Sequence, residues 1–326
     1  MAPAAAPRFG LCCTFLEQPI KFRTTTAKFT ASLPPRERAL HLREIASHNA
    51  DALVDALAWC VDNGIGAFRV NSQILPLATH PALGYELAEL DPDGAIEQRF
   101  RRAGAAVARH ALRVSFHPDQ FVVLGSARDE VVQSSVRELE YQAQVAEWIG
   151  AEQLTVHGGG AQGGKPAAIE RLARGIDRLS ARARAKLVLE NDDRVYTVRD
   201  LLPLCQREAV PLIYDVHHHR CNPDDLGELD ATEVAAATWG EREPWVHLSS
   251  PSAGWKAGDP RHHADYIDWS DVPAGWLKRR MTIDIEAKAK ELAVVALKTR
   301  WAEETRAGGV KKRGGSAAAA RGIGEP

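Results

Sequence analysis

The chain has 326 residues, 45% of them hydrophobic and 26% charged, a composition that excludes a fibrous or wholly disordered protein. It contains no run of 18 apolar residues, so we expect no membrane span. The net charge of −2 taken alone argues against a nucleic-acid partner, because such proteins usually carry a basic surface. The five cysteines are scattered without a CxxC pair and the first ten residues lack a secretory pattern, which favours a reduced, cytoplasmic protein.

Short β-branched runs alternate with helical patterns along most of the chain. The expected strands lie at 8–13, 65–70, 112–116, 153–157, 186–190, 211–216, 245–249 and 281–286. The expected helices lie at 34–63, 95–110, 128–149, 167–183, 198–207, 231–239 and 287–301. Eight strand–helix units predict one (β/α)8 TIM barrel over residues 8–301, with long loops at its C-terminal face; a doubly wound open sheet is the alternative.

Three segments fall outside this alternation. Residues 1–7 are expected to be disordered, and residues 302–326 form a Gly/Ala-rich basic tail that we expect to be flexible. Residues 250–280 form a long connection, and five of the eight tryptophans lie between 239 and 276. Because tryptophan is rare in disordered segments, this connection is predicted to be ordered and functional.

An imidazole or a carboxylate stands at the end of each of six consecutive expected strands. These residues are His117, His157, Glu190, Asp215, His247 and Glu286. Barrel enzymes build their sites at the C-terminal ends of strands. One such residue alone is more often a loop hydrogen-bonding group or a helix cap, but six in succession predict a metal site for Zn, Mn, Fe or Co. Glu190, in the middle of the set, could bridge two ions on a phosphodiester.

A second motif is set aside. Residues 159–165 match the GxxxxGK spacing of a phosphate-binding loop, but Pro166 stands where a Mg²⁺-binding hydroxyl is required. A flexible glycine-rich loop is the favoured interpretation.

At these residues the sequence resembles the UV damage endonuclease family of metal-dependent TIM barrels. The motifs that carry the resemblance are FRVNSQILPLATH, SFHPDQF, VHGGG, LENDD, YDVHHH, HLSS, HHADYI and IEAKAKE. The resemblance implies a monomeric DNA repair enzyme that hydrolyses damaged double-stranded DNA 5′ to UV photoproducts or other helix-distorting lesions, leaving a 3′-hydroxyl. It implies two or three divalent ions, Mn²⁺ first and Zn²⁺ or Co²⁺ as alternatives.

The resemblance also implies roles for individual residues. The metal ligands are His117, His157, Glu190, Asp215, His218, His247 and Glu286. Glu190, His80 and His263 are placed in the catalytic set, and Asn71, Gln120 and Phe121 in the DNA-binding set. Gln120 and Phe121 stand where the family has a Gln-Tyr pair that wedges into the duplex.

Three positions depart from the family pattern. Phe121 and Leu11 replace tyrosines that probe the lesion, and Trp245 replaces a lysine near the metals, so we expect an altered damage preference. A sugar isomerase or epimerase on the same kind of barrel remains an alternative, as does a non-catalytic lesion-binding protein.

Two divalent ions would change the net charge from −2 to +2, so composition understates the positive field at the site. Lys21-Phe22-Arg23 and Trp255-Lys256 suit phosphate contact with base stacking.

Overall fold

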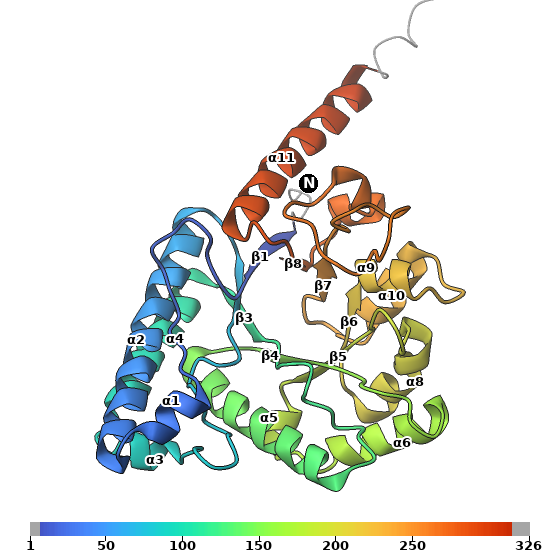
Figure 1. Cartoon of the computed structure of the whole chain (residues 1–326). Coiled ribbons are helices and arrows are strands. Elements are labelled where there is room, and N and C mark those ends of the chain that lie inside the picture. Colours follow the sequence, from blue (N-terminus) through green and yellow to red (C-terminus); the bar gives the residue numbers. More distant parts are fainter. Residues whose placement is uncertain (1–6, 315–326) are drawn as a thin grey trace, which may run out of the picture.

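The computed structural model describes residues 7–314 and forms a closed barrel of eight parallel strands that follow one another in chain order (Figure 1). The strands are β1 Arg8–Cys12, β2 Ala67–Val70, β3 Arg113–Phe116, β4 Gln153–His157, β5 Leu187–Glu190, β6 Leu212–Asp215, β7 Trp245–Leu248 and β8 Thr282–Ile285. Pairing of β1 with β8 closes the sheet. The predicted TIM barrel is therefore confirmed, and the open sheet is excluded.

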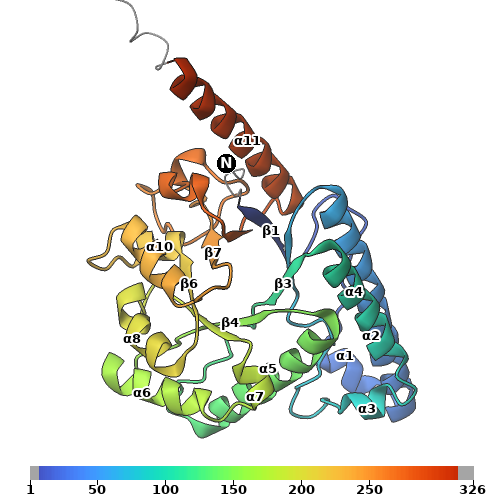
Figure 2. The same cartoon turned by 180° about the vertical axis from the view of Figure 1, so that it is seen from behind.

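Helices surround the barrel in an outer layer, as the view from behind in Figure 2 also shows. They are α1 Ala27–Ser32, α2 Pro35–Asp62, α3 Leu87–Leu90, α4 Ala95–His110, α5 Asp129–Ile149, α6 Lys165–Ile176, α7 Ala181–Arg184, α8 Val198–Glu208, α9 Val216–Cys221, α10 Glu228–Ala237 and α11 Glu291–Gly314. The single helix expected at 167–183 is two helices, because the Ser180 side chain accepts a hydrogen bond from the N–H of Ala183 and starts α7. Two short 3-10 helices, Trp269–Asp271 and Ala274–Lys278, order part of the long connection before β8.

The C-terminal helix is longer than the sequence pattern indicates. It was expected to end at residue 301, but α11 continues to Gly314, so residues 302–314 of the expected flexible tail are helical. Ala302, Glu303 and Glu304 are good helix formers, and Glu304 pairs with Arg300 one turn earlier. Residues 1–6 and 315–326, where disorder was also expected, lie outside the described residues.

The alternation of side chains along each strand separates the barrel interior, which is polar at its C-terminal mouth and apolar below it, from an apolar outer layer. Residues two apart share one face of a strand. On β7, Val246 and Leu248 belong to the main apolar core beneath the helices, whereas Trp245 packs in a separate cluster with the interior residues of other strands. The same alternation places His247, two residues after Trp245, inside the barrel mouth.

β1 contributes no residue to the predicted ligand set, but it leaves space for a side chain inside the barrel. A Cβ built on Gly10 would lie 2.0 Å from Oδ1 of Asp284 on the neighbouring β8, so only glycine allows this carboxylate into the barrel. All five cysteines are free, as their scattered spacing predicts. Among the described residues, no helix is long and apolar enough to cross a membrane.

Candidate metal centre

The six residues predicted from the strand ends converge at the C-terminal mouth of the barrel. His157, Glu190 and Asp215 are the last residues of β4, β5 and β6, and His247 lies within β7. His117 and Glu286 directly follow β3 and β8. Since β3 to β8 are consecutive neighbours in the sheet, their C-terminal ends bring all six side chains into one cluster.

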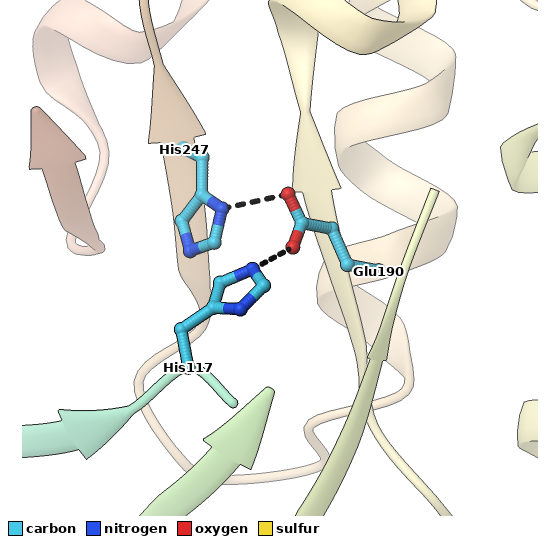
Figure 3. A group of neighbouring side chains, drawn as sticks. All are labelled: His117, Glu190 and His247. Carbon is cyan, nitrogen blue, oxygen red and sulfur yellow. Dashed lines mark hydrogen bonds and ion pairs between the residues drawn. The ribbon is translucent and has the colours of Figure 1, made fainter. Parts of the chain in front are cut away.

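Glu190 occupies the middle of this cluster. One carboxylate oxygen lies 2.8 Å from Nδ1 of His247 and the other 2.9 Å from Nε2 of His117, and Figure 3 shows both rings directed at it. His157 and His218 lie slightly farther from the same carboxylate, at 3.4 Å each. Nδ1 of His117 lies 3.1 Å from the carbonyl oxygen of Pro118, which leaves Nε2 facing the cluster.

Three overlapping groups of side chains could each hold a metal ion. They are His117–Glu190–His247, Glu190–Asp215–His218 and Asp215–His247–Glu286, with the potential ligand atoms of each group within 4.8 Å of one another. Glu190, Asp215 and His247 each belong to two groups. Oδ2 of Asp215 is buried without a hydrogen-bond partner among the described residues, as expected of an oxygen that is free to ligate a cation. The residues present therefore fit a site for more than one divalent ion.

A buried arginine supports the cluster from β2. Arg69 donates to Oδ2 of Asp284 at 3.1 Å and to Oε1 of Glu286 at 2.6 Å, and its Nη2 lies 2.8 Å from Nε2 of His247. The cluster thus holds four carboxylates, those of Glu190, Asp215, Asp284 and Glu286, against one permanent cation. Buried charge is costly unless it is paired, so the excess of carboxylates favours bound cations.

The pKa shifts of the cluster follow from this crowding. Burial alone would raise the pKa of Glu190, but the neighbouring His247 and His157 and the hydrogen bond from His117 hold it well below its usual range. Burial likewise opposes ionisation of Glu286, and the charge of Arg69 outweighs it and lowers the pKa. Burial lowers the pKa of His157. Glu190 and Glu286 are therefore ionised at neutral pH, which is the state that ligates metals.

The two other histidines of the expected catalytic set lie apart from the centre of the cluster. His263, in the segment between β7 and β8, lies 3.7 Å through Nδ1 from Oε2 of Glu286, at the edge of the cluster. His80 lines a cavity of about 450 Å³ together with Phe121 and Tyr141, outside the three ligand groups. Its Nδ1 accepts the N–H groups of Ala82 and Leu83, so Nε2 is its free nitrogen.

The expected DNA-binding residues lie in the loops after β2 and β3. Phe121 is 77% exposed, which is unusual for a large apolar side chain. Its N–H donates to Oδ1 of Asp119, and this local bond shapes the loop that presents Phe121 and the exposed Gln120. Asn71 accepts the N–H of Gln73 through its side chain and shapes the loop after β2.

The two remaining departures from the family pattern are buried. Leu11 is fully buried in the core, so this position cannot touch a DNA lesion. Trp245 is also fully buried, and the guanidinium of Arg113 lies 4.3 Å from its ring centre. An apolar ring there fills the barrel interior below His247.

Arg69, Asp284 and His217 also lie at the site, although the strand-end pattern did not point to them. Arg69 and Asp284 stand inside otherwise apolar strands, AFRV and TIDI, and a charge in such a run is a signal that could have found them. His217 is fully buried, and neither ring nitrogen has a partner among the described residues.

The fold and this cluster define a class: a TIM barrel whose mouth carries a histidine–carboxylate centre able to hold metal ions. The family described as UV-endonuclease UvdE matches residues 7–317. The UV DNA damage endonuclease of Bacillus cereus (strain 03BB102) is 34% identical over 286 residues, covering 84% of this chain and 87% of that protein. The enzyme of the same name from Nostoc sp. (strain PCC 7120) is 32% identical and covers 91% of each chain.

Solved structures agree with the sequence relatives. The crystal structure of SacUVDE superposes with a TM-score of 0.77 at 29% identity and covers 89% of this chain and 96% of that one. Endonuclease IV from Thermus thermophilus shares the fold, with a TM-score of 0.60 at 19% identity. The chain belongs to the UV-endonuclease family. It is an endonuclease of DNA repair, an enzyme that acts on phosphodiester bonds.

Proposed function

We propose that the protein is a metal-dependent endonuclease that cuts damaged double-stranded DNA 5′ to UV photoproducts or other helix-distorting lesions and leaves a 3′-hydroxyl. The observation that carries the proposal is the set of three overlapping ligand groups around Glu190 at the barrel mouth of a family of endonucleases. A paired metal site of this kind suits in-line displacement at a phosphodiester.

Seven residues would hold two or three ions in this proposal: His117, His157, Glu190, Asp215, His218, His247 and Glu286. Histidine and carboxylate donors without thiolate suit Mn²⁺, which we place first, and also Zn²⁺ or Co²⁺. When bound, such ions activate water and neutralise the charge that develops on the scissile phosphate.

The protein's own groups position this centre. Arg69 fixes the carboxylate of Glu286, and Glu190 holds the rings of His117 and His247 in place. His263, beside Glu286, is placed where it can hold a proton or a phosphate oxygen at the edge of the centre. We assign His80 to the DNA close to Phe121, because both line one cavity.

Damage recognition is assigned to the loop after β3. Phe121 offers an exposed ring that can fill a gap in a distorted base stack, and Gln120 beside it can hydrogen-bond to base edges. Asn71, in the loop after β2, is also assigned to DNA binding. Without a hydroxyl on its ring, Phe121 contributes stacking and apolar contact only.

The isomerase alternative has support from the fold alone. Two sugar epimerases superpose on this chain with TM-scores of 0.54 and 0.52, each at 11% identity. The family match over residues 7–317 favours the nuclease. A monomeric state and a cytoplasmic location stay predictions.

The test is nicking of supercoiled plasmid. We expect the protein with Mn²⁺ to nick UV-irradiated plasmid and to leave unirradiated plasmid largely intact, and a chelator to abolish nicking. End-labelled duplexes with one photoproduct locate the cut, and extension by a polymerase reports the 3′-hydroxyl. Equal nicking of both plasmids, or nicking that survives the chelator, would refute the proposal.

A further inference from the structure

Trp255 is an exposed aromatic side chain that the catalytic centre does not use. It lies in the segment between β7 and β8, which runs between α10 and α11 in both views (Figures 1 and 2). Every residue from 252 to 259 is exposed, and the side chain of Trp255 is 37% exposed. A tryptophan in such a stretch adds little to the core.

The ring of Trp255 is nevertheless fixed in place. Its indole N–H donates to Oδ1 of the buried Asp271 at 2.7 Å, and the guanidinium of Arg220 lies 5.5 Å from its ring centre. The ring of His217 lies 5.0 Å away on the barrel side. An aromatic surface that is already ordered loses little conformational entropy when a ligand stacks on it.

A short chain of contacts joins Trp255 to the metal centre. The ring of His217 lies 5.2 Å from that of His263, and His263 lies 3.7 Å from Glu286. Trp255 is thus on the rim of the mouth, two side chains from a carboxylate of the centre.

The strands that precede Phe121 and Trp255 lie on opposite sides of the barrel. Phe121 follows β3 and Trp255 follows β7, and these strands are four apart in a closed ring of eight. With strands about 4.8 Å apart and tilted, the barrel is roughly 15 Å across. At about 3.4 Å per base step, this span corresponds to four or five nucleotides. We therefore expect the two rings to meet different base steps.

We propose that Trp255 is a second DNA-contacting aromatic residue, which stacks on a base on the side of the scissile phosphate opposite Phe121. The inference rests on the proposed endonuclease function. An aromatic face beside a cation is the combination that binds nucleic acid through a base and its phosphate, and Lys256, the residue after Trp255, is exposed.

A purely structural role makes a different prediction. Trp255 also covers His217, which is fully buried next to His218. If covering His217 were its function, loss of the ring would disturb the metal centre and its metal content. If stacking is its function, loss of the ring weakens DNA binding and leaves the metal content unchanged.

The experiment compares W255A, W255F and the wild-type holoenzyme in steady-state incision of a duplex with one photoproduct. Leu229→Ala is the matched control, because Leu229 is 53% exposed on α10 in the outer layer. We expect W255A to raise KM by about 5- to 150-fold, the value of one stacked base, with kcat within about threefold. W255F should retain most of the affinity, and L229A should match the wild type.

Two further readouts accompany the kinetics. The metal content of all variants should be equal. Addition of DNA should quench part of the tryptophan emission of the wild type, and this component should be missing in W255F. An unchanged KM for W255A, or a loss of bound metal in W255A, would overturn the stacking role while leaving the endonuclease function intact. Failure of the wild type to cut damaged DNA would overturn both.

Discussion

Glu190→Gln tests the central feature of the site, because four histidines lie within 3.4 Å of this carboxylate. Glutamine has nearly the same size but lacks the charge, and its amide NH₂ replaces one of the two oxygens that face His117 and His247. The variant loses a shared oxygen donor from two of the three potential metal groups.

The size of the effect can be bounded from the contacts. Loss of a hydrogen-bonding partner behind a metal ligand costs about 10- to 100-fold in metal affinity or activity. Loss of a ligand shared by two ions should cost at least the upper value, about 100-fold or about 2.7 kcal/mol. We therefore expect E190Q to lose bound metal and to cut irradiated plasmid at least about 100-fold more slowly.

The assay combines metal analysis of the purified protein with plasmid nicking in Mn²⁺, and circular dichroism reports the fold. Glu243→Gln is the matched control, since the Glu243 side chain is 7% exposed and binds Thr282 and Arg8 near the opposite end of the barrel. Nicking by E190Q within threefold of the wild type, or a full metal load, would refute a shared ligand role.

Three further predictions test other parts of the molecule. Phe121→Ala should lower the ratio of incision on damaged to undamaged DNA by about 5- to 150-fold, the value of one lost stacking contact, with unchanged metal content; an unchanged ratio would place the wedge elsewhere. Arg69→Gln leaves the carboxylates of Asp284 and Glu286 without their cation. It should therefore lower the free energy of unfolding of the metal-free protein by about 3–5 kcal/mol. Added Mn²⁺ should restore part of the lost free energy. Urea unfolding with and without Mn²⁺ measures both effects, and a metal-free variant as stable as the wild type would contradict the role of Arg69. Burial acts to raise the pKa of Glu243, but hydrogen bonds from Thr282 and Arg280 outweigh it and lower the pKa. The ionised group therefore stabilises the fold above its unfolded pKa of about 4.3, and this contribution is lost as the pH falls through the lower folded value. As the pH falls from about 5 to about 3, the free energy of unfolding should therefore decrease less for E243Q than for the wild type, as measured by urea unfolding. If the two proteins lose the same free energy over this range, the lowered pKa of Glu243 is refuted.

The barrel could be predicted because its signals are local. Each strand is a short apolar run, long helices such as α4 and α5 have a 3.6-residue pattern, and caps such as Thr197 before α8 lie beside the elements they start. The end of α11 and the break between α6 and α7 could not be placed, because the pattern alone does not decide where a helix frays or is capped anew.

The expected ligands could be named because strand ends share one edge of a parallel barrel, so position in sequence alone puts them together. His80 shows the limit of this reasoning. It comes from a loop, and only the path of residues 71–86 takes it to the cavity beside Phe121 instead of the centre of the cluster. Loops have no repeating geometry from which a side chain could be placed.

The sequence by itself determined the eight strand–helix units and the six chemically active strand ends, since both follow from periodic patterns within about twenty residues. Only the tertiary structure decided that Arg69 balances Asp284 and Glu286, that Gly10 makes room for one of them, and that the indole of Trp255 packs beside His217. The physical reason is that Arg69 and Glu286 are 217 positions apart and that Gly10 and Asp284 lie on the first and last strands, so that closure of the barrel alone brings each pair into contact.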